Sequence, residues 1–184
     1  MRVKERIRQE IEEKLGGMGD YVKMDYLLNC LKNDLDFETR RFVFVKLTGL
    51  YEDRKMFSDA AKMMLSAAEI NTLYQNKIND FVKSCDLYIK AGNYKIAETV
   101  MKKALEIANE KQKEEVKNSI IEFFKTRGKS FSDNNKRKHA VDVYEHLLDL
   151  QLNESEKGEI REKLSKLYEN LGRIRDYYRV RKQI

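Results

Sequence analysis

Residues 81–108, FVKSCDLYIKAGNYKIAETVMKKALEIA, contain two helical patterns separated by a short break. In residues 81–89 the apolar side chains recur every three or four positions, which places them on one side of an α-helix, and residues 96–108 repeat this spacing. Between the two patterns, Gly92 can adopt the left-handed conformation that ends a helix, and Asn93 can cap the next helix. The stretch therefore predicts two antiparallel helices joined by a tight turn.

The same pattern recurs along the chain. The small residue in the middle of the second helix is Ala60, Ala97 and Ala140 in turn, at intervals of 37 and 43 residues. Tyr177 follows Ala140 by 37 residues, and Met24 precedes Ala60 by 36. Self-similarity at such a period is typical of proteins built from stacked helix pairs. We therefore predict one all-α domain over residues 1–184, with five helix pairs at approximately 3–33, 39–70, 73–108, 112–151 and 156–184.

Several helix ends can be predicted in more detail. Asp34 or Asp36 is available to cap the first helix of the second pair, and Ser58 or Asp59 to cap its second helix. The first helix of the third pair is predicted to begin early, near Leu73. The extra residues of the fourth pair keep helical spacing, so its first helix is predicted to be extended at its N-terminal end.

The pattern of large and small residues resembles the tetratricopeptide repeat. The resemblance is strongest over residues 44–68 and 81–104, where the aromatic, leucine-like, small and tyrosine-like positions of that family are nearly all occupied. The small residue of the first helix is, in successive pairs, Glu12 (a departure), Thr48, Cys85, Gly128 and Ser165. The chain also lacks the proline that usually closes each repeat. Its pattern is similar as well to the longer helical hairpins of the soluble NSF-attachment proteins of vesicle fusion, and the sequence leaves both relationships open.

The resemblance implies a right-handed α-α superhelix whose first helices line a concave groove for an extended or helical peptide. The residues implied to face this groove are Phe42, Val45, Gly49, Glu52, Asn79, Val82, Asp86, Lys90, Glu122, Lys125, Lys129, Glu162, Lys166 and Glu169. One subclass of the family grips a C-terminal carboxylate with a lysine and asparagines, but the corresponding positions here are Val45, Gly49, Val82 and Asp86. Recognition of chaperone tails is therefore not expected.

Four of these positions predict a different kind of partner. Phe42, Val45, Gly49 and Val82 would form an apolar floor that suits an amphipathic helix. The alternative is that Phe42 and Val45 pack under the first helix pair. The leading hypothesis is accordingly an interaction scaffold that binds a peptide or helix of another protein.

Composition excludes several other classes. With 41% hydrophobic and 37% charged residues, the chain lies outside the disordered class. It has no apolar run near the ~20 residues of a membrane span, and its first residues, MRVKERIRQEIEEK, lack the apolar core of a signal peptide. A cytoplasmic location is expected. Cys30 and Cys85 each lie in an apolar helical stripe and are expected to be buried free thiols.

The net charge of +6 includes two basic clusters. One is Lys136-Arg137-Lys138-His139, and the other contains Arg173, Arg175, Arg179, Arg181 and Lys182, with only Asp176 opposed. Arginines interleaved with Tyr177 and Tyr178 are compatible with anion or RNA binding. A solvated end of the helix stack is the favoured interpretation. RNA binding is the second functional hypothesis, and a structural subunit or fragment of a larger helical assembly is the third.

No catalytic constellation is evident. His139 and His146 are two helical turns apart, and no phosphate-binding loop, paired cysteine ligands or nucleophile motif occurs. We expect no enzymatic activity, metal or cofactor. The sequence leaves the identity of the partner and the oligomeric state open.

Overall fold

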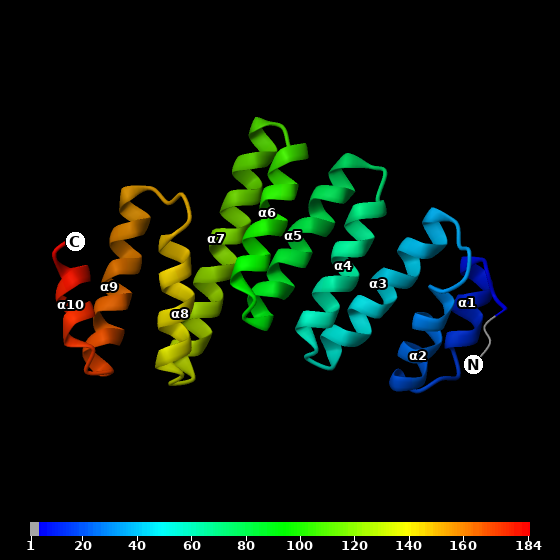
Figure 1. Cartoon of the computed structure of the whole chain (residues 1–184), viewed down its shortest axis with the longest axis horizontal. Coiled ribbons are helices and arrows are strands. Elements are labelled where there is room, and N and C mark those ends of the chain that lie inside the picture. Colours follow the sequence, from blue (N-terminus) through cyan, green and yellow to red (C-terminus); the bar gives the residue numbers. More distant parts are fainter. Residues whose placement is uncertain (1–3) are drawn as a thin grey trace. The chain divides into compact units, whose positions relative to one another are not determined.

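The computed structural model describes residues 4–184, in which there are ten helices and no strand (Figure 1). They are α1 (Arg8–Leu15), α2 (Asp20–Cys30), α3 (Phe37–Asp53), α4 (Phe57–Ile70), α5 (Tyr74–Ala91), α6 (Tyr94–Ile107), α7 (Glu110–Asp133), α8 (Arg137–Leu148), α9 (Glu154–Asn170) and α10 (Ile174–Arg181). The all-α prediction with repeated helix pairs is confirmed. Val3, where the first pair was predicted to begin, lies outside the described residues.

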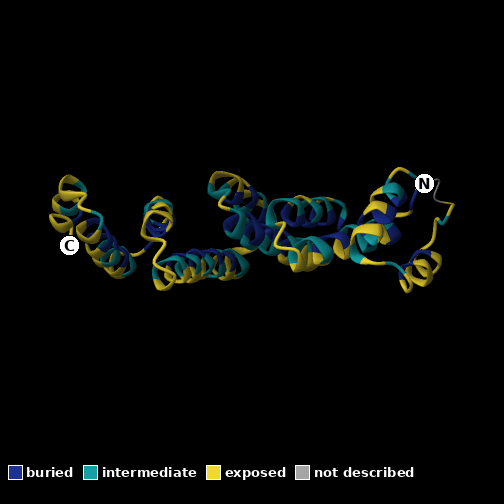
Figure 2. Cartoon of the chain, turned by 90° about the horizontal axis from the view of Figure 1, so that it is seen from below, coloured by how far each residue is buried: buried dark blue, intermediate teal, exposed yellow. Residues whose placement is uncertain are grey.

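The chain forms two compact units, Met1–Val116 and Lys117–Ile184, which we call the N-terminal and C-terminal units. The boundary falls within α7. In the N-terminal unit α3 packs on α4, α4 on α5 and α5 on α6, while in the C-terminal unit α8 packs on α9 and α9 on α10. Most helices carry buried residues on one side and exposed residues on the other, as Figure 2 shows. The prediction of a single domain stays a prediction.

A left-handed residue ends the first helix of four pairs. These residues are Lys55, Gly92, Asn135 and Gly172, with φ of 59°, 80°, 58° and 67°. In each case the backbone N–H of the following residue donates to the carbonyl of an aromatic residue five positions earlier, as in Asn93 to Tyr88 at 2.9 Å. This is the six-to-one hydrogen bond of a Schellman helix end. The intervals of 37, 43 and 37 residues confirm the repeat in the backbone itself.

Three predictions about helix starts are confirmed. The Asp36 carboxylate accepts a hydrogen bond from the Thr39 backbone N–H at 2.8 Å and caps α3. Helix α5 begins directly after Leu73. Helix α7 has 24 residues and begins at Glu110, so the first helix of the fourth pair is extended at its N-terminal end.

The predicted caps of α4 and α6 are wrong. Helix α4 follows Met56, so Ser58 and Asp59 lie inside it, and no side chain caps its start. Asn93 precedes α6 but makes no capping hydrogen bond, and its amide instead donates to Ser58 Oγ at 3.2 Å. The physical reason is the backbone: Met56 and Asn93 have ψ of 58° and 59° after the left-handed residue, whereas a capping residue needs an extended backbone.

Small residues allow the two helices of a pair to approach closely. Thr48, Cys85 and Ser165 are buried. The Thr48 hydroxyl and the Cys85 thiol donate to the carbonyls of Ala60 and Ala97 on the facing helix, at 3.4 and 3.3 Å. A Cβ atom added at Gly128 would lie 2.5 Å from the Tyr144 ring. The small position therefore serves helix packing, and Glu12, which departs from it in the first pair, is exposed and pairs with Arg8 and Lys46.

Cys30 and Cys85 are free, buried thiols, as predicted. Burial raises the pKa of both groups, and the charge of neighbouring Asp86 adds to the increase at Cys85. At neutral pH both therefore remain protonated and pack as small apolar side chains.

Candidate interaction face

Eight of the predicted groove residues lie on the neighbouring helices α3 and α5, and none of them is fully buried. We call them the α3–α5 face: Phe42, Val45, Gly49 and Glu52 from α3, and Asn79, Val82, Asp86 and Lys90 from α5. They are spaced every three or four residues, so each set runs along one side of its helix. All eight therefore lie on two adjacent helices and reach solvent, and their role as groove residues stays a prediction.

An arginine–aspartate bridge joins α3 to α5 at one end of this face. Arg41 Nη2 lies 2.8 and 3.1 Å from the two carboxylate oxygens of Asp80, and Arg41 Nε lies 3.2 Å from one of them. The Asn71 amide also donates to Asp80, at 2.8 Å, from the loop between α4 and α5. A bidentate, partly buried ion pair of this kind fixes the relative orientation of the two side chains as well as their distance. It ties the N-terminal half of α3 to α5.

A charged network joins the same helices towards their C-terminal ends. Glu52 on α3 accepts hydrogen bonds from Lys83 at 2.9 Å and Lys90 at 3.4 Å, and Lys90 also pairs with Asp86 at 2.8 Å. Burial alone would raise the pKa of Glu52, but the two lysines outweigh it and hold that pKa below its usual value. Burial would likewise lower the pKa of Lys90, but Asp86 and Glu52 raise it. Glu52, Asp86 and Lys90 are thus brought together.

Between these two bridges the face is apolar and open. Val45 is 36% exposed, and Val82 is half-buried. Gly49 lies within α3, and a Cβ atom added there would meet no atom within 4 Å. The middle of the face therefore offers an uncharged strip held between two helices whose spacing is fixed at both ends.

Two residues at the margins have partners of their own. Phe42 packs against the hydrophobic cluster of the first helix pair, with the Arg8 guanidinium 4.8 Å and the Lys46 ammonium 5.4 Å from its ring centroid. This is the alternative role that the sequence left open for it. Asn79 is exposed and accepts a hydrogen bond from Gln75 at 3.2 Å.

The other predicted groove residues belong to the C-terminal unit. Lys125 on α7 pairs with Glu156 at 3.3 Å and Glu159 at 3.9 Å on α9, and Lys129 is exposed. Glu122, Glu162, Lys166 and Glu169 are exposed as well. Lys125 thus repeats the role of Lys90, because it links the first helices of successive pairs.

The predicted anion-binding residues at the C-terminus divide into two groups. Arg173 pairs with Asp176 at 2.7 Å and stacks on the Tyr168 ring, and Arg179 pairs with Asp176 at 2.9 Å. Arg181 lies 5.9 Å from the Tyr177 ring centroid. Arg175 and Lys182 are exposed and form no ion pair within residues 4–184.

Sequence reasoning missed the residues that organise the α3–α5 face. Arg41, Asp80 and Lys83 were not singled out, although their bridges set the spacing of the two helices. The sequence did contain a signal for this bridge. When the second and third helix pairs are aligned by the 37-residue period, Arg41 aligns with Ile78, which is within one helical turn of Asp80.

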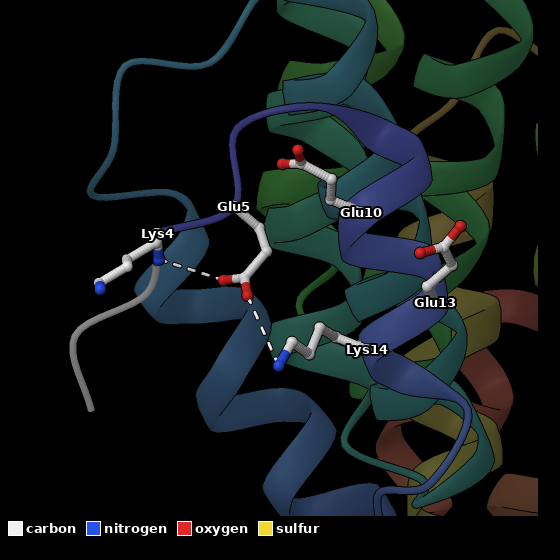
Figure 3. Close-up of a pocket in the computed structure, with 5 residues that line it drawn as sticks. All are labelled: Lys4, Glu5, Glu10, Glu13 and Lys14. Carbon is white, nitrogen blue, oxygen red and sulfur yellow. Dashed lines mark hydrogen bonds and ion pairs between the residues drawn. The ribbon is translucent and has the colours of Figure 1, made fainter.

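A polar hollow of about 510 Å³ lies at the N-terminal end, lined by Lys4, Glu5, Glu10, Glu13 and Lys14 (Figure 3). The Lys4 backbone N–H donates to Glu5 at 3.1 Å, and Lys14 Nζ lies 3.9 Å from the same carboxylate. The backbone N–H of Glu5 contributes most to holding the pKa of this carboxyl below its usual value. Across residues 4–184, no three His, Cys, Asp or Glu side chains are grouped as a metal ion would require.

In the described part of the chain, no helix combines the length and apolar character needed to cross a membrane.

No protein-family model matches the chain, and no curated protein matches it. Among solved structures, it is similar to MamA, residues 41 to the end, from Desulfovibrio magneticus RS-1. The two chains are 11% identical, with a TM-score of 0.42 over 96% of this chain and 88% of the other. A likeness at that level carries no argument about fold or function, so the structure of this chain has to supply both.

Proposed function

We propose that this protein is an interaction scaffold, and that its α3–α5 face binds an amphipathic helix or extended peptide of another protein. The observation that carries the proposal is the open apolar strip of Val45, Gly49 and Val82 between two ion-paired bridges. A helix presented to such a strip can bury its apolar side there and keep its polar side in water. We also propose that the protein is cytoplasmic and has no catalytic activity.

Gly49 leaves room for a partner to approach the α3 backbone closely. Glycine in an exposed helix costs about 1 kcal/mol of stability relative to alanine. At Gly128 that cost has an internal reason, because the Tyr144 ring occupies the space of a Cβ atom. At Gly49, as at Gly158 in α9, nothing within residues 4–184 occupies that space. A partner that approaches the α3 backbone closely would account for the glycine.

The proposal can be tested by site-specific photo-crosslinking in the source cells. A photoreactive amino acid at Asn79, an exposed residue of the α3–α5 face, is expected to form adducts with one defined protein. The same group at Lys102, on the exposed side of α6, is the control and should not form that adduct. Equal labelling of the same protein from both positions would rule the face out as its binding site.

Binding of the captured partner then tests the apolar strip. Val45→Glu should weaken the partner's affinity at least about tenfold, since it buries a charge in the contact. The matched control is Ile96→Glu on α6, because Ile96 is also an exposed aliphatic residue, 45% exposed, and lies outside the face. Both variants should keep the parent's circular dichroism spectrum. An unchanged affinity of the Val45→Glu variant for the partner would contradict the proposal.

A further inference from the structure

The positive charge of this protein is concentrated in the C-terminal unit. Residues 117–184 carry five of the six net positive charges of the chain. Within this unit, the α7–α8 turn and the α9–α10 turn lie at the same edge (Figure 1). Lys136, Arg137 and Lys138 follow the first turn, and Arg173 and Arg175 follow the second. We call these five residues the basic edge.

Most of the basic edge is not neutralised by the protein itself. Lys136, Arg137, Lys138 and Arg175 are exposed, and none of them forms an ion pair within the described residues. Arg173 differs, because Asp176 and Glu145 lie 2.7 and 3.7 Å from its guanidinium. Elsewhere in the same unit lysines and glutamates pair regularly, as Lys157 does with Glu154 and Lys163 with Glu159. Across residues 4–184, four of the five cations of the basic edge are therefore unpaired, as are Lys129, Lys166 and Lys182 elsewhere in the unit.

An exposed ring accompanies each half of the basic edge. His139 directly follows Lys138, is exposed, and packs against the Phe131 ring with centroids 5.2 Å apart. Tyr178 is 61% exposed and contacts only the edge of Tyr177 among the rings of residues 4–184. It lies three residues after Arg175 and four before Lys182, so both cations share its side of α10.

We propose that the basic edge and these two rings bind single-stranded nucleic acid. Lys136, Arg137, Lys138 and Arg175 would contact successive phosphates, and His139 and Tyr178 would stack on bases. Cations that follow the backbone, together with exposed aromatic rings, are the usual means by which proteins hold single strands without reading sequence. This function is independent of the α3–α5 face, whose residues all lie in the other unit.

The surface fits two other acidic partners less well. Basic residues alone attract an anionic membrane electrostatically, but lasting attachment also takes apolar side chains that enter the lipid. Residues 134–139, Asn-Asn-Lys-Arg-Lys-His, contain no apolar residue, and only Ile174, 57% exposed, lies between the cations of the other half. An acidic peptide would pair with the cations but would leave the exposed His139 and Tyr178 rings without a role. Flat bases separated by phosphates match both features.

The first test measures the salt dependence of binding. The probe is a fluorescent single-stranded RNA of about 20 nucleotides, and the full chain is titrated by anisotropy. Four phosphate contacts predict that the logarithm of affinity falls with the logarithm of salt with a slope of about −2.8, or about 50-fold between 50 and 200 mM. Lys136→Gln combined with Lys138→Gln should reduce the slope to about −1.4. The control Lys95→Gln with Lys102→Gln removes the same charge from exposed positions of α6 and should leave it unchanged.

The second test asks whether the rings stack on bases. Tyr178→Ala should weaken RNA binding roughly 5- to 150-fold, the range of a single lost stacking contact. The control is Tyr74→Ala, because Tyr74 is also an exposed tyrosine, at 72%, but lies in the N-terminal unit. DNA and RNA single strands are compared to identify the source of the strand, and duplex RNA should bind more weakly than either.

Three results would overturn the proposal. One is no measurable binding of single strands in low salt. Another is a Tyr178→Ala variant that binds as tightly as the parent, which would leave only unspecific attraction of charge. The third is tighter binding to phosphatidylserine vesicles or polyglutamate than to RNA, which would assign the surface to a membrane or to an acidic protein instead.

Discussion

Replacing Gly128 by alanine tests a close contact between α7 and α8 in the C-terminal unit. A Cβ atom at this position of α7 would lie 2.5, 2.6 and 3.0 Å from three ring atoms of Tyr144 on α8. Carbon atoms pack best at about 3.5–4.0 Å, so the ring would have to move by about 1 Å. Tyr144 is only 2% exposed, and its neighbours leave it little room. Overpacking of this kind costs about 1–3 kcal/mol.

The comparison with Gly158→Ala isolates that packing cost. Gly158 lies in α9, where an added Cβ atom would meet nothing within 4 Å. Both substitutions gain about 1 kcal/mol from the higher helix propensity of alanine, so this gain cancels between them. We expect Gly158→Ala to be more stable than the parent, and Gly128→Ala to be less stable than Gly158→Ala by about 1–3 kcal/mol.

Urea denaturation of the three proteins, followed by circular dichroism, measures the difference. Both glycines lie in the C-terminal unit, so any separate unfolding of the N-terminal unit affects the two variants equally. In thermal unfolding, a difference of 1 kcal/mol corresponds to about 2–4 °C for a chain of this length. Equal stability of the two variants would refute the close approach of α7 and α8 at Gly128, and with it the packing role assigned to the small position.

Three other predictions concern single positions, each measured by the urea midpoint. Lys55→Gly should stabilise the protein by up to about 1 kcal/mol, and Gly92→Ala should destabilise it by a similar amount, because both residues are left-handed, with φ of 59° and 80°. The explanation requires the two changes in stability to be similar in size and opposite in sign. Asp36→Ala should lower the urea midpoint through loss of the α3 cap, whereas Asp34→Ala, at an exposed position outside the helix, should leave it unchanged. The lowered pKa of Glu52 means that its stabilising contribution is fully present above the ordinary value of 4.5 and is lost as pH falls through the lower folded value. The free energy of unfolding of the parent should therefore exceed that of Glu52→Gln by up to about 1 kcal/mol at pH 7, and the difference should shrink as the pH falls below 4.5. A difference that stays constant would contradict the ion-pair explanation.

The helix pairs could be predicted from sequence because burial repeats along the chain. Gly92 and Gly172 mark two of the four left-handed helix ends directly, since glycine takes that conformation at little cost. Asn135 is also of a type that adopts this conformation, whereas Lys55 takes it without such a preference. At Lys55 the aligned repeat imposes the backbone, and local preference yields to it.

The residues of the α3–α5 face could also be predicted, but their partners could not. Helical spacing identifies which positions avoid the core, which is why Val45 and Gly49 were found. The Arg41–Asp80 bridge joins residues 39 positions apart. Such a pair depends on how two helices are placed and on the side-chain conformations they permit, and neither is written in a local pattern. The failed cap at Asn93 has the same origin, because the preceding turn fixes its backbone.

Ligand binding to the two proposed surfaces should differ in its sensitivity to salt, because the charges of the α3–α5 face are paired within the protein and most of those of the basic edge are not. On the α3–α5 face, Glu52 and Asp86 are held by Lys83 and Lys90, and a charged partner would have to separate them. Selection there must come from shape and apolar contact with the uncharged strip, which salt screens little. On the basic edge four of the five cations are unpaired within the described residues, and each phosphate that binds to them releases counterions. A moderate increase in salt should therefore remove a bound single strand and leave a bound helix in place, so that one titration assigns each ligand to its surface.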